Sequence, residues 1–530
     1  MTSLTLAGQL RAVAESYRAK AAVRIDDECI TYGSLLDHAA QLQRALALVD
    51  SPFLGLLGRK SAIMFHGIFA AIQSGCPYMP LNPDEPVERL AAMLARSGCR
   101  MLLAEADGEK LLRALLGSVS EPLVVILPDT ATAPDWWPQA GPHRCIAGAE
   151  LAALQGAGRT PGVAPLAYLL FTSGSTGTPK MVTVTQHQVS AYVANIVERC
   201  RPSAEDRFSQ LAPLSFDFSV HDIFVAWSVG ASIHPCPQRD MYSLASFIVR
   251  HGISIWASVP STITFLNRSR QLAAGVFPAM RHAFFCGEAL PESLAVKWHE
   301  AAPNCVIDNL YGPTEATVAV TAYRWTPAGE AGIVPIGLPF ANIDVALVRD
   351  DGSEAADGEA GELWLAGDQV VDCYASDPER TSVSFADRHG RRWYRTGDYA
   401  QRAADGCLRY RGRADDQLQV RGQRVERKEI EVLLRGLAGG VDVAVMGWPP
   451  ERGNQVEGLV FIVDDDTLDL MALRRQCQQH LAVYMQPLRI IAQPIPASRN
   501  GKVDYRRLGA MLAELMSAPG AGAVAPPETR

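Results

Sequence analysis

Short apolar runs alternate with stretches of helical periodicity along the first three quarters of the chain. One apolar helix face is formed by Leu35, Ala39, Leu42, Leu46 and Val49. A hairpin pattern precedes this helix, and further strand–helix units follow it. The hairpin pattern lies at residues 23–30, and the later apolar runs lie at 124–127, 167–171, 253–257 and 282–285. This alternation predicts an α/β architecture with largely parallel sheets.

The pattern changes between about residues 343 and 410, where turn signals such as Asp350-Asp351-Gly352 and Asp405-Gly406 predict antiparallel β structure. Beyond Gly412 the pattern predicts a small α+β unit. Its expected helices are 427–437 and 468–481, and its expected strands are 441–446 and 458–463.

These changes predict three parts of the chain. A large N-terminal domain is expected at 1–413, a small C-terminal domain at 416–515, and a short polar hinge between them. The last segment, 516–530, is low in complexity and is expected to be disordered.

Composition excludes several classes of protein. The 530 residues are 48% hydrophobic and 20% charged, which is typical of a soluble globular chain. The net charge of −8 disfavours nucleic acid as a partner. Eleven scattered cysteines without a C-x-x-C pair argue against a zinc site and a disulfide framework. No signal peptide or membrane-spanning run is evident, so we expect a cytoplasmic protein.

A loop rich in glycine and hydroxyl groups, residues 170–180, is the strongest chemical signal. Glycines let the backbone approach a ligand closely, and successive N–H groups form a concave anion site. A flexible linker is the alternative, but an apolar strand leads into this run and Pro179-Lys180 closes it. We therefore predict a phosphate-binding loop. Its candidate ligands are Thr172, Ser173, Gly174, Ser175, Thr176, Gly177 and Lys180.

Four further clusters carry chemistry that complements a phosphate loop. Residues 309–315 offer an aromatic face for a base and a carboxylate for Mg²⁺. Residues 394–398 place a carboxylate in a turn, suited to the vicinal hydroxyls of a sugar. Residues 412–415 supply a guanidinium, and residues 500–504 a lysine. Each alone is an ordinary turn, but chance explains their joint occurrence poorly.

Together these motifs resemble those of the adenylate-forming superfamily, from about residue 30 to residue 507. The similarity is greatest to the amino-acid adenylation domains of nonribosomal peptide synthetases, and it extends to D-alanine–carrier-protein ligases. Further matching segments are Thr31-Tyr32, 75–90, 377–381 and the hinge segment 412–431. Arg427-Lys428 departs from the neutral pair usual in that segment, and we interpret it as a solvated helix start.

The resemblance implies a large N-terminal domain of two α/β subdomains plus a small β-barrel, followed by a mobile α+β domain. It implies ATP and Mg²⁺ as cofactors. The implied nucleotide ligands are the phosphate loop, Tyr311 on adenine with Gly312 and Thr314, Asp398 on the ribose with Arg413 beside it, and Glu315 on Mg²⁺. Lys502, Thr176 and Glu315 are the implied catalytic residues, and Asp415 is the implied hinge.

The same resemblance implies a substrate pocket, in which Asp217 would pair with the α-ammonium of an amino acid. The alternative for Asp217 is a helix cap, and His221 is either packed or a donor to a polar side chain. Bulky side chains predict a small amino acid of the glycine, alanine, serine or cysteine class. The implied pocket is Asp217, Phe218, His221, Ala257, Phe284, Cys286, Leu310, Val318, Ala319 and Lys502.

No segment resembles a carrier or condensation domain, so we expect a free-standing enzyme. It would form aminoacyl-AMP and transfer the aminoacyl group to the phosphopantetheine thiol of a separate carrier protein. Two alternatives remain open. One is an acyl- or aryl-CoA ligase, and the other is a catalytically silent nucleotide-binding scaffold.

Overall fold

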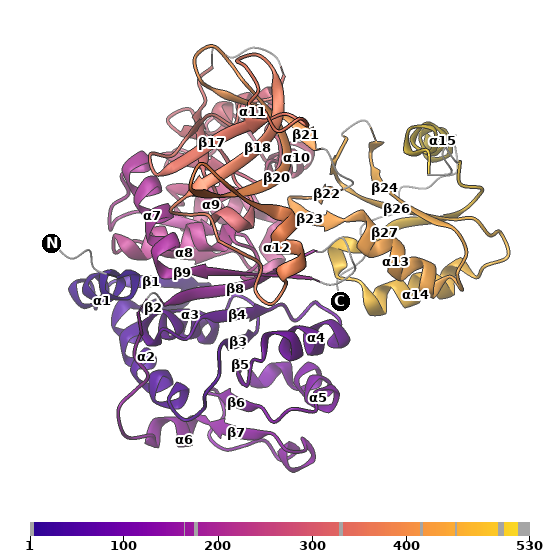
Figure 1. Cartoon of the computed structure of the whole chain (residues 1–530). Helices are drawn as coiled ribbons and strands as arrows, with labels where there is room; N and C mark the ends of the chain where they lie inside the picture. The colour runs from indigo at the N-terminus through magenta and orange to yellow at the C-terminus, as the bar shows by residue number, and fades with distance from the viewer. Residues whose placement is uncertain are drawn as a thin grey trace. The chain divides into compact units, whose positions relative to one another are not determined.

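The structure is a computed structural model that describes residues 5–163, 165–173, 179–327, 332–413, 417–450, 453–496 and 503–517 (Figure 1). Contacts divide the chain into two compact units. The first comprises Met1–Pro83, Val87–Phe171 and Met181–Arg411, and the second comprises Asp84–Pro86, Thr172–Lys180 and Gly412–Arg530.

The larger sheet has nine strands in the order β16-β15-β14-β13-β12-β10-β11-β1-β2. Its centre is parallel, and β12 and β13 are buried at every position, so both faces of the sheet are covered. The carboxyl ends of these strands therefore meet at one edge. The strands are β1 (Ala21–Ile25), β2 (Glu28–Thr31), β10 (Arg207–Gln210), β11 (Ser232–Pro235), β12 (Ile255–Ser258), β13 (His282–Phe285), β14 (Val306–Tyr311), β15 (Thr321–Arg324) and β16 (Leu338–Pro339).

A second sheet has seven strands in the order β7-β6-β5-β3-β4-β8-β9. Residues at the C-terminal end of β8 and the start of β9 bound the predicted phosphate loop. The strands are β3 (Leu54–Leu57), β4 (Tyr78–Leu81), β5 (Met101–Ala104), β6 (Val124–Leu127), β7 (Arg144–Ala147), β8 (Leu166–Thr172) and β9 (Lys180–Thr185). Both parallel sheets agree with the predicted α/β class.

Two helices of this unit are buried almost all round, because most of their residues are apolar. They are α3 (Ala62–Ser74), buried from Met64 to Ser74, and α8 (Phe218–Ser228), buried from Phe218 to Trp227. The predicted face at Leu35 lies on α2, which ends at Leu46, so Val49 packs from the following loop. The remaining helices are α1 (Leu6–Ser16), α2 (Tyr32–Leu46), α4 (Val87–Ser97), α5 (Glu109–Ser118), α6 (Gly148–Ala153), α7 (Gln186–Cys200), α9 (Leu244–His251), α10 (Pro260–Arg268), α11 (Glu292–Ala301) and α12 (Pro378–Ser384).

The antiparallel region forms a five-stranded sheet in the order β17-β18-β20-β19, with β21 also paired to β20. Buried positions alternate with exposed or partly exposed ones along β18 as far as Leu365, as expected for a sheet with one covered face. This half-barrel stands where a small β-barrel was expected. Its strands are β17 (Ile343–Val348), β18 (Ala360–Gly367), β19 (Phe385–Arg388), β20 (Arg391–Arg402) and β21 (Leu408–Arg413).

The second unit has the predicted α+β composition. It contains a sheet in the order β24-β26-β27 and a smaller sheet in the order β23-β22-β25. The strands are β22 (Gln417–Val420), β23 (Gln423–Glu426), β24 (Val443–Trp448), β25 (Gln455–Val456), β26 (Gly458–Val463) and β27 (Pro487–Ala492). The helices are α13 (Arg427–Leu437), α14 (Leu470–His480) and α15 (Tyr505–Ser517).

Two expectations for this unit need correction. Arg427 does not begin a solvated helix: it is buried, and its guanidinium lies 4.0 Å from the ring centre of Tyr505. An aromatic face can accept a buried guanidinium in this way. Lys428 is exposed, as expected. Helix α15 continues to Ser517, two residues into the predicted disordered tail, and residues 518–530 lie outside the described part of the chain.

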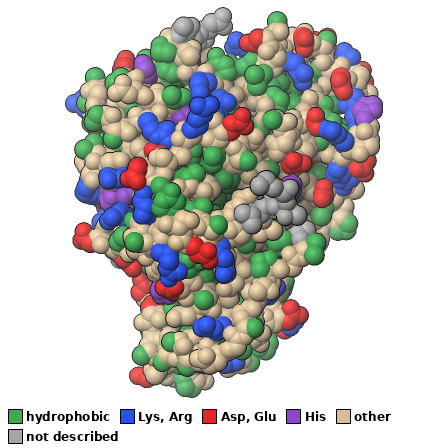
Figure 2. All heavy atoms as spheres, turned by 90° about the vertical axis from the view of Figure 1, so that its left-hand side faces the viewer, with side chains coloured by type: hydrophobic (Ala, Val, Ile, Leu, Met, Phe, Trp, Pro, Cys, Tyr) green, Lys and Arg blue, Asp and Glu red, His purple; other side chains and the backbone are tan. Residues whose placement is uncertain are grey.

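Among the described residues, no helix is both long and apolar enough to cross a membrane. On the face of the molecule shown in Figure 2, basic and acidic side chains are interspersed. This face therefore has no large area of a single charge sign.

Candidate functional site

Tyr311 and Asp398, predicted separately from two motifs, are hydrogen-bonded to each other. Tyr311 ends β14, and its hydroxyl donates to Oδ2 of Asp398 on β20 at 2.5 Å. Tyr410 donates to Oδ1 of the same carboxylate at 3.4 Å. Gly312 follows, and a Cβ there would lie 2.5 Å from Cα of Ala319, so only glycine fits.

The Tyr311 hydroxyl stays protonated beside this carboxylate. Burial raises the pKa of Tyr311 well above its ordinary value, and the charge of Asp398 raises it further. A phenolate next to a carboxylate would be doubly unfavourable. Tyr311 is therefore a fixed donor, and its ring lies at the carboxyl edge of the larger sheet, with the ring of Tyr410 centred 6.4 Å away.

Glu315 lies in a short 3-10 turn, η4 (Thr314–Ala316), directly after the Tyr311 strand. Its side chain is fully buried, and its Oε1 accepts a hydrogen bond from the hydroxyl of Tyr374 at 2.6 Å. The Tyr374 hydroxyl also lies 3.4 Å from that of Tyr394. A buried carboxylate needs partners of this kind to remain charged. The sequence patterns had not indicated Tyr374, which stands 59 residues from Glu315.

The phosphate loop is described only at its two ends. Thr172 ends β8, and Ser173 is buried, with its hydroxyl donating to the backbone oxygen of Arg424 at 2.9 Å. The remaining predicted loop ligands, Gly174, Ser175, Thr176 and Gly177, lie outside the described residues.

Lys180, at the far end of this loop, forms an ion pair inside the second unit. Its Nζ lies 3.2 Å from Oε1 of Glu426, and the two side chains are only 9% and 11% exposed. Gln417 donates to the same carboxylate oxygen at 2.7 Å. Lys180 thus already binds an anionic oxygen in this structure, which is the chemistry that a phosphate would need.

Asp217 stands at the start of α8 but does not cap it. The residue occupies the N-cap position, yet its side chain accepts no capping hydrogen bond, which removes the predicted alternative. The negative charge of Asp217 contributes to raising the pKa values of Tyr168, Tyr192 and Cys286, after the larger effect of burial. The field of this carboxylate therefore favours the neutral form of two phenols and a thiol.

His221, one turn further along α8, is fully buried in an aromatic setting. Its Nδ1 lies 2.7 Å from the hydroxyl of Tyr192, and the rings of Phe284 and Phe218 are centred 4.7 and 5.4 Å away. Its Nε2 has no hydrogen-bond partner within the described part of the chain. Burial lowers the pKa of His221 to about 3, so the ring is neutral at physiological pH.

Strand register places two predicted pocket residues on one face of the larger sheet. Ala257 is directly paired with Phe284 across the parallel strands β12 and β13, so both side chains point to the same side. The sulfur of Cys286 lies 4.0 Å from the backbone oxygen of Val318. The predicted apolar pocket residues belong to one buried cluster: Phe218, Ala257, Phe284, Cys286, Leu310, Val318 and Ala319.

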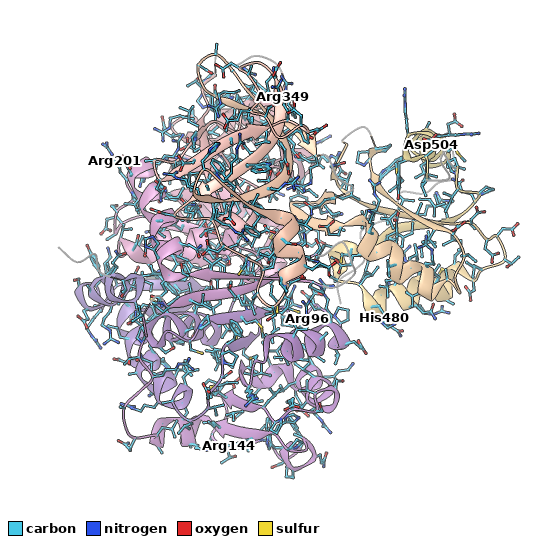
Figure 3. The ribbon with its side chains drawn as sticks, in the orientation of Figure 1. Arg96, Arg144, Arg201, Arg349, His480 and Asp504 are labelled. Atoms are coloured by element: carbon cyan, nitrogen blue, oxygen red, sulfur yellow. The ribbon has the colours of Figure 1, made fainter. Side chains whose placement is uncertain are left out.

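Three further predicted residues stay predictions. Arg413 ends β21 and falls in the second unit, while Asp415 and Lys502 lie outside the described residues. Asp504, two residues beyond Lys502, stands at the start of α15 (Figure 3), where its carboxylate accepts a hydrogen bond from the backbone N–H of Arg507 at 3.0 Å.

Sequence reasoning missed the hydroxyl groups that support this site. Tyr374 holds Glu315, Tyr410 holds Asp398, and Tyr192 holds His221. They come from elements far apart in the chain, so no local spacing joins them to their partners. Only the tertiary structure could identify them.

Comparison with known proteins gives these features a context. The model of the family "AMP-binding enzyme" matches residues 10–375. An L-proline–[L-prolyl-carrier protein] ligase from Pseudomonas fluorescens is 31% identical, over 92% of this chain and 95% of its own. A D-alanine–D-alanyl carrier protein ligase from Bacillus licheniformis is 27% identical, over 91% and 94%.

A solved structure agrees over almost the full length. The Vibrio cholerae adenylation domain AlmE, in complex with glycyl-adenosine-5'-phosphate, superposes with a TM-score of 0.88. It is 30% identical, and the match covers 97% of this chain and 98% of that one. The family model covers more than half of the chain, and the first of these relatives aligns over nearly its whole length. The chain belongs to the AMP-binding enzyme family.

Proposed function

We propose that this protein is a ligase that adenylates a small amino acid with ATP, releases pyrophosphate, and loads the amino acid onto a carrier protein. One observation carries the proposal. Asp217 does not cap its helix, and its negative charge helps to raise the pKa values of the buried Tyr168, Tyr192 and Cys286. An anionic group in such a setting suits the ammonium of an amino acid.

The nucleotide would lie along the carboxyl edge of the larger sheet. Tyr311 offers its ring to adenine, and Asp398 beside it offers carboxylate oxygens to the ribose hydroxyls. The phosphate loop, from Thr172 to Gly177 with Lys180, would bind the β- and γ-phosphates, with Gly312 and Thr314 near the nucleotide. We place Arg413 beside the ribose.

Glu315 is the proposed protein ligand for Mg²⁺. Among the described residues no group of three or more His, Cys, Asp or Glu side chains could hold a metal. A single buried carboxylate still fits, because Mg²⁺ is often held by one or two carboxylates together with phosphate oxygens and water. When bound, the ion would neutralise charge on the phosphates. Tyr374 would hold the Glu315 carboxylate in place.

The pocket should admit only a small side chain. Phe218, His221, Phe284 and Leu310, which we propose as its lining, are all large and all buried. Neutral His221 offers no counter-charge to an acidic side chain. The relatives named above act on proline or D-alanine, or were solved with a glycyl adenylate. We propose the glycine, alanine, serine or cysteine class for this protein.

The reaction has two steps. A carboxylate oxygen of the amino acid attacks the α-phosphorus of ATP, and the bond to pyrophosphate breaks. Lys502 and Thr176 would stabilise the charge that develops at this centre. In the second step the phosphopantetheine thiol of a separate carrier attacks the acyl carbon, AMP departs, and the thiol proton is released. A rotation of the C-terminal domain (416–515) against the core (1–413) about Asp415 would separate the two steps.

Pyrophosphate exchange tests the proposal. Glycine, alanine, serine and cysteine are compared with larger amino acids and with acetate and propionate, which are the des-amino analogues of glycine and alanine. We expect exchange with a small amino acid and little with its des-amino analogue. Exchange with the des-amino acids would favour an acyl-CoA ligase. Exchange with none of the compounds would favour a catalytically silent scaffold.

A further inference from the structure

Thr317 and Val318, which follow Glu315 closely in the chain, adopt a backbone conformation that their side chains disfavour. Thr317 has φ of 55° and Val318 has φ of 72°, both in the left-handed region. Both are β-branched, and such residues rarely occupy this region. Val318 and the following Ala319 are walls of the proposed substrate pocket. The strained turn therefore sets where these walls stand, and something must hold it.

Gln369 makes the contacts that hold this turn. Its side chain is fully buried, and its Nε2 donates to the backbone oxygen of Ala319 at 2.7 Å. The same amide lies 3.4 Å from the backbone oxygens of Ala316 and Thr317. The backbone oxygen of Gln369 in turn accepts a hydrogen bond from the Thr317 hydroxyl at 2.6 Å. Gln369 thus donates a hydrogen bond to the strained turn and accepts one from it.

Asn195 on α7 fixes the orientation of the Gln369 amide. Its Nδ2 donates to Oε1 of Gln369 at 2.8 Å and to Oδ1 of Asn342 at 2.9 Å. Carbonyl oxygens only accept, so Nε2 of Gln369 must face the turn while Oε1 faces Asn195. Nearby, the backbone N–H of Val371 donates to the backbone oxygen of Glu315 at 2.9 Å. The segment after β18 is therefore attached to the whole Glu315–Ala319 turn.

We propose that Gln369 is a positioning residue that sets the size limit of the substrate pocket. It does so by holding Val318 and Ala319 in a strained turn that the local sequence does not favour. The inference rests on the proposed function, because it takes Val318 and Ala319 as walls facing the substrate. Sequence motifs did not indicate Gln369, since it stands 50 residues from the turn that it holds.

A purely structural role would give a different result, and the chain offers a matched control. Gln43 is also buried, and its amide donates to the backbone oxygens of Gln73 at 2.9 Å and Arg159 at 3.1 Å. Replacing either glutamine by methionine keeps the side-chain length and leaves buried carbonyls without a donor. Both variants should lose stability, but only Gln369→Met should alter substrate selection.

The experiment compares pyrophosphate exchange with glycine, alanine, 2-aminobutyrate and norvaline, which differ by one methylene at each step. Wild type should show a steep loss of kcat/KM beyond its preferred length. For the first compound that wild type rejects, Gln369→Met should raise kcat/KM, relative to that of the preferred substrate, by about tenfold. One methylene is worth about 10- to 200-fold in a formed pocket. Gln43→Met should keep the wild-type profile.

A second variant tests the same inference without replacing Gln369 itself. Asn195→Leu removes the donor that orients the amide but leaves Gln369 in place, so it should flatten the profile in the same direction and to a smaller extent. Thermal unfolding establishes that each variant is folded. An unchanged length profile in folded Gln369→Met would overturn the inference, even if its overall rate falls. Absence of exchange in wild type would instead count against the proposed function.

Discussion

The hydroxyl of Tyr311 donates a 2.5 Å hydrogen bond to Asp398, and this bond joins the end of β14 to β20. The two residues come from motifs that are 87 positions apart. The proposed adenine platform and ribose ligand are therefore one assembly. This bond sets the position of the one relative to the other.

Removing the Tyr311 hydroxyl should weaken ATP binding while keeping the ring. Tyr311→Phe removes the 2.5 Å bond to Asp398 and leaves the longer bond from Tyr410 in place. We expect KM for ATP to rise roughly fivefold, because one hydrogen bond to a charged group is worth about 1.5–3 kcal/mol and water replaces part of it. Titration of ATP in the exchange assay measures this. Tyr410→Phe, which removes the 3.4 Å bond, should have a smaller effect. Equal effects of the two variants would contradict the proposed pairing.

The hydrogen bond from Tyr374 to Glu315 should affect how pyrophosphate exchange depends on the Mg²⁺ concentration. Tyr374→Phe removes the 2.6 Å donor to Oε1 of Glu315 and frees the carboxylate to move. We expect the Mg²⁺ concentration for half-maximal exchange to rise about threefold to tenfold, with Glu315→Gln raising it further. Tyr399→Phe provides a comparison, because it removes a hydroxyl that donates instead to the exposed Asp350. If Glu315→Gln leaves the Mg²⁺ requirement unchanged, Glu315 is not the ligand.

Acid should destabilise the fold through its buried histidines. Burial lowers the pKa values of His66, His221 and His234 to about 3, from an ordinary value of 6.5. Below pH 6.5 the unfolded chain takes up protons that the folded chain refuses. The stability that these groups contribute is therefore complete above pH 6.5 and is lost as the pH falls toward 3.

Each such histidine should cost about 1.4 kcal/mol per pH unit within that interval. The midpoint of unfolding in guanidinium chloride, measured from about pH 8 down to pH 5, reports this loss of stability. His221→Leu removes one of the three groups and should give a shallower dependence on pH, whatever its effect on stability at pH 8. An unchanged slope would mean that His221 is protonated in the folded protein.

Much of the fold follows from local pattern, because strand and helix periods are local properties. The hairpin at β1 and β2 and the parallel strands β12 and β13 stand within two residues of their predicted positions. Long-range partners do not follow from pattern. The pairing of Ala257 with Phe284 is set by strand register, and the burial of Arg427 depends on Tyr505, which is 78 positions later in the chain.

The same division applies to the candidate site. Residues that would touch substrate or nucleotide occur in short motifs, where neighbouring positions must serve one ligand. Tyr374, Tyr192 and Gln369 support those residues from other elements. Nothing in the sequence around each of them marks the tyrosine or glutamine as part of the site. Their function is visible only from the hydrogen bonds that they make.

The role of Asp217 in selecting an amino acid is measured by comparing wild type with one variant. Exchange is measured for wild type and Asp217→Ala with the amino acid that wild type prefers. Titration of ATP in parallel checks that the nucleotide site is intact. We expect kcat/KM for the amino acid to fall by at least about 100-fold, because its buried ammonium loses its charge partner, while ATP binding is retained. Undiminished activity of Asp217→Ala on that amino acid would mean that Asp217 does not bind its ammonium.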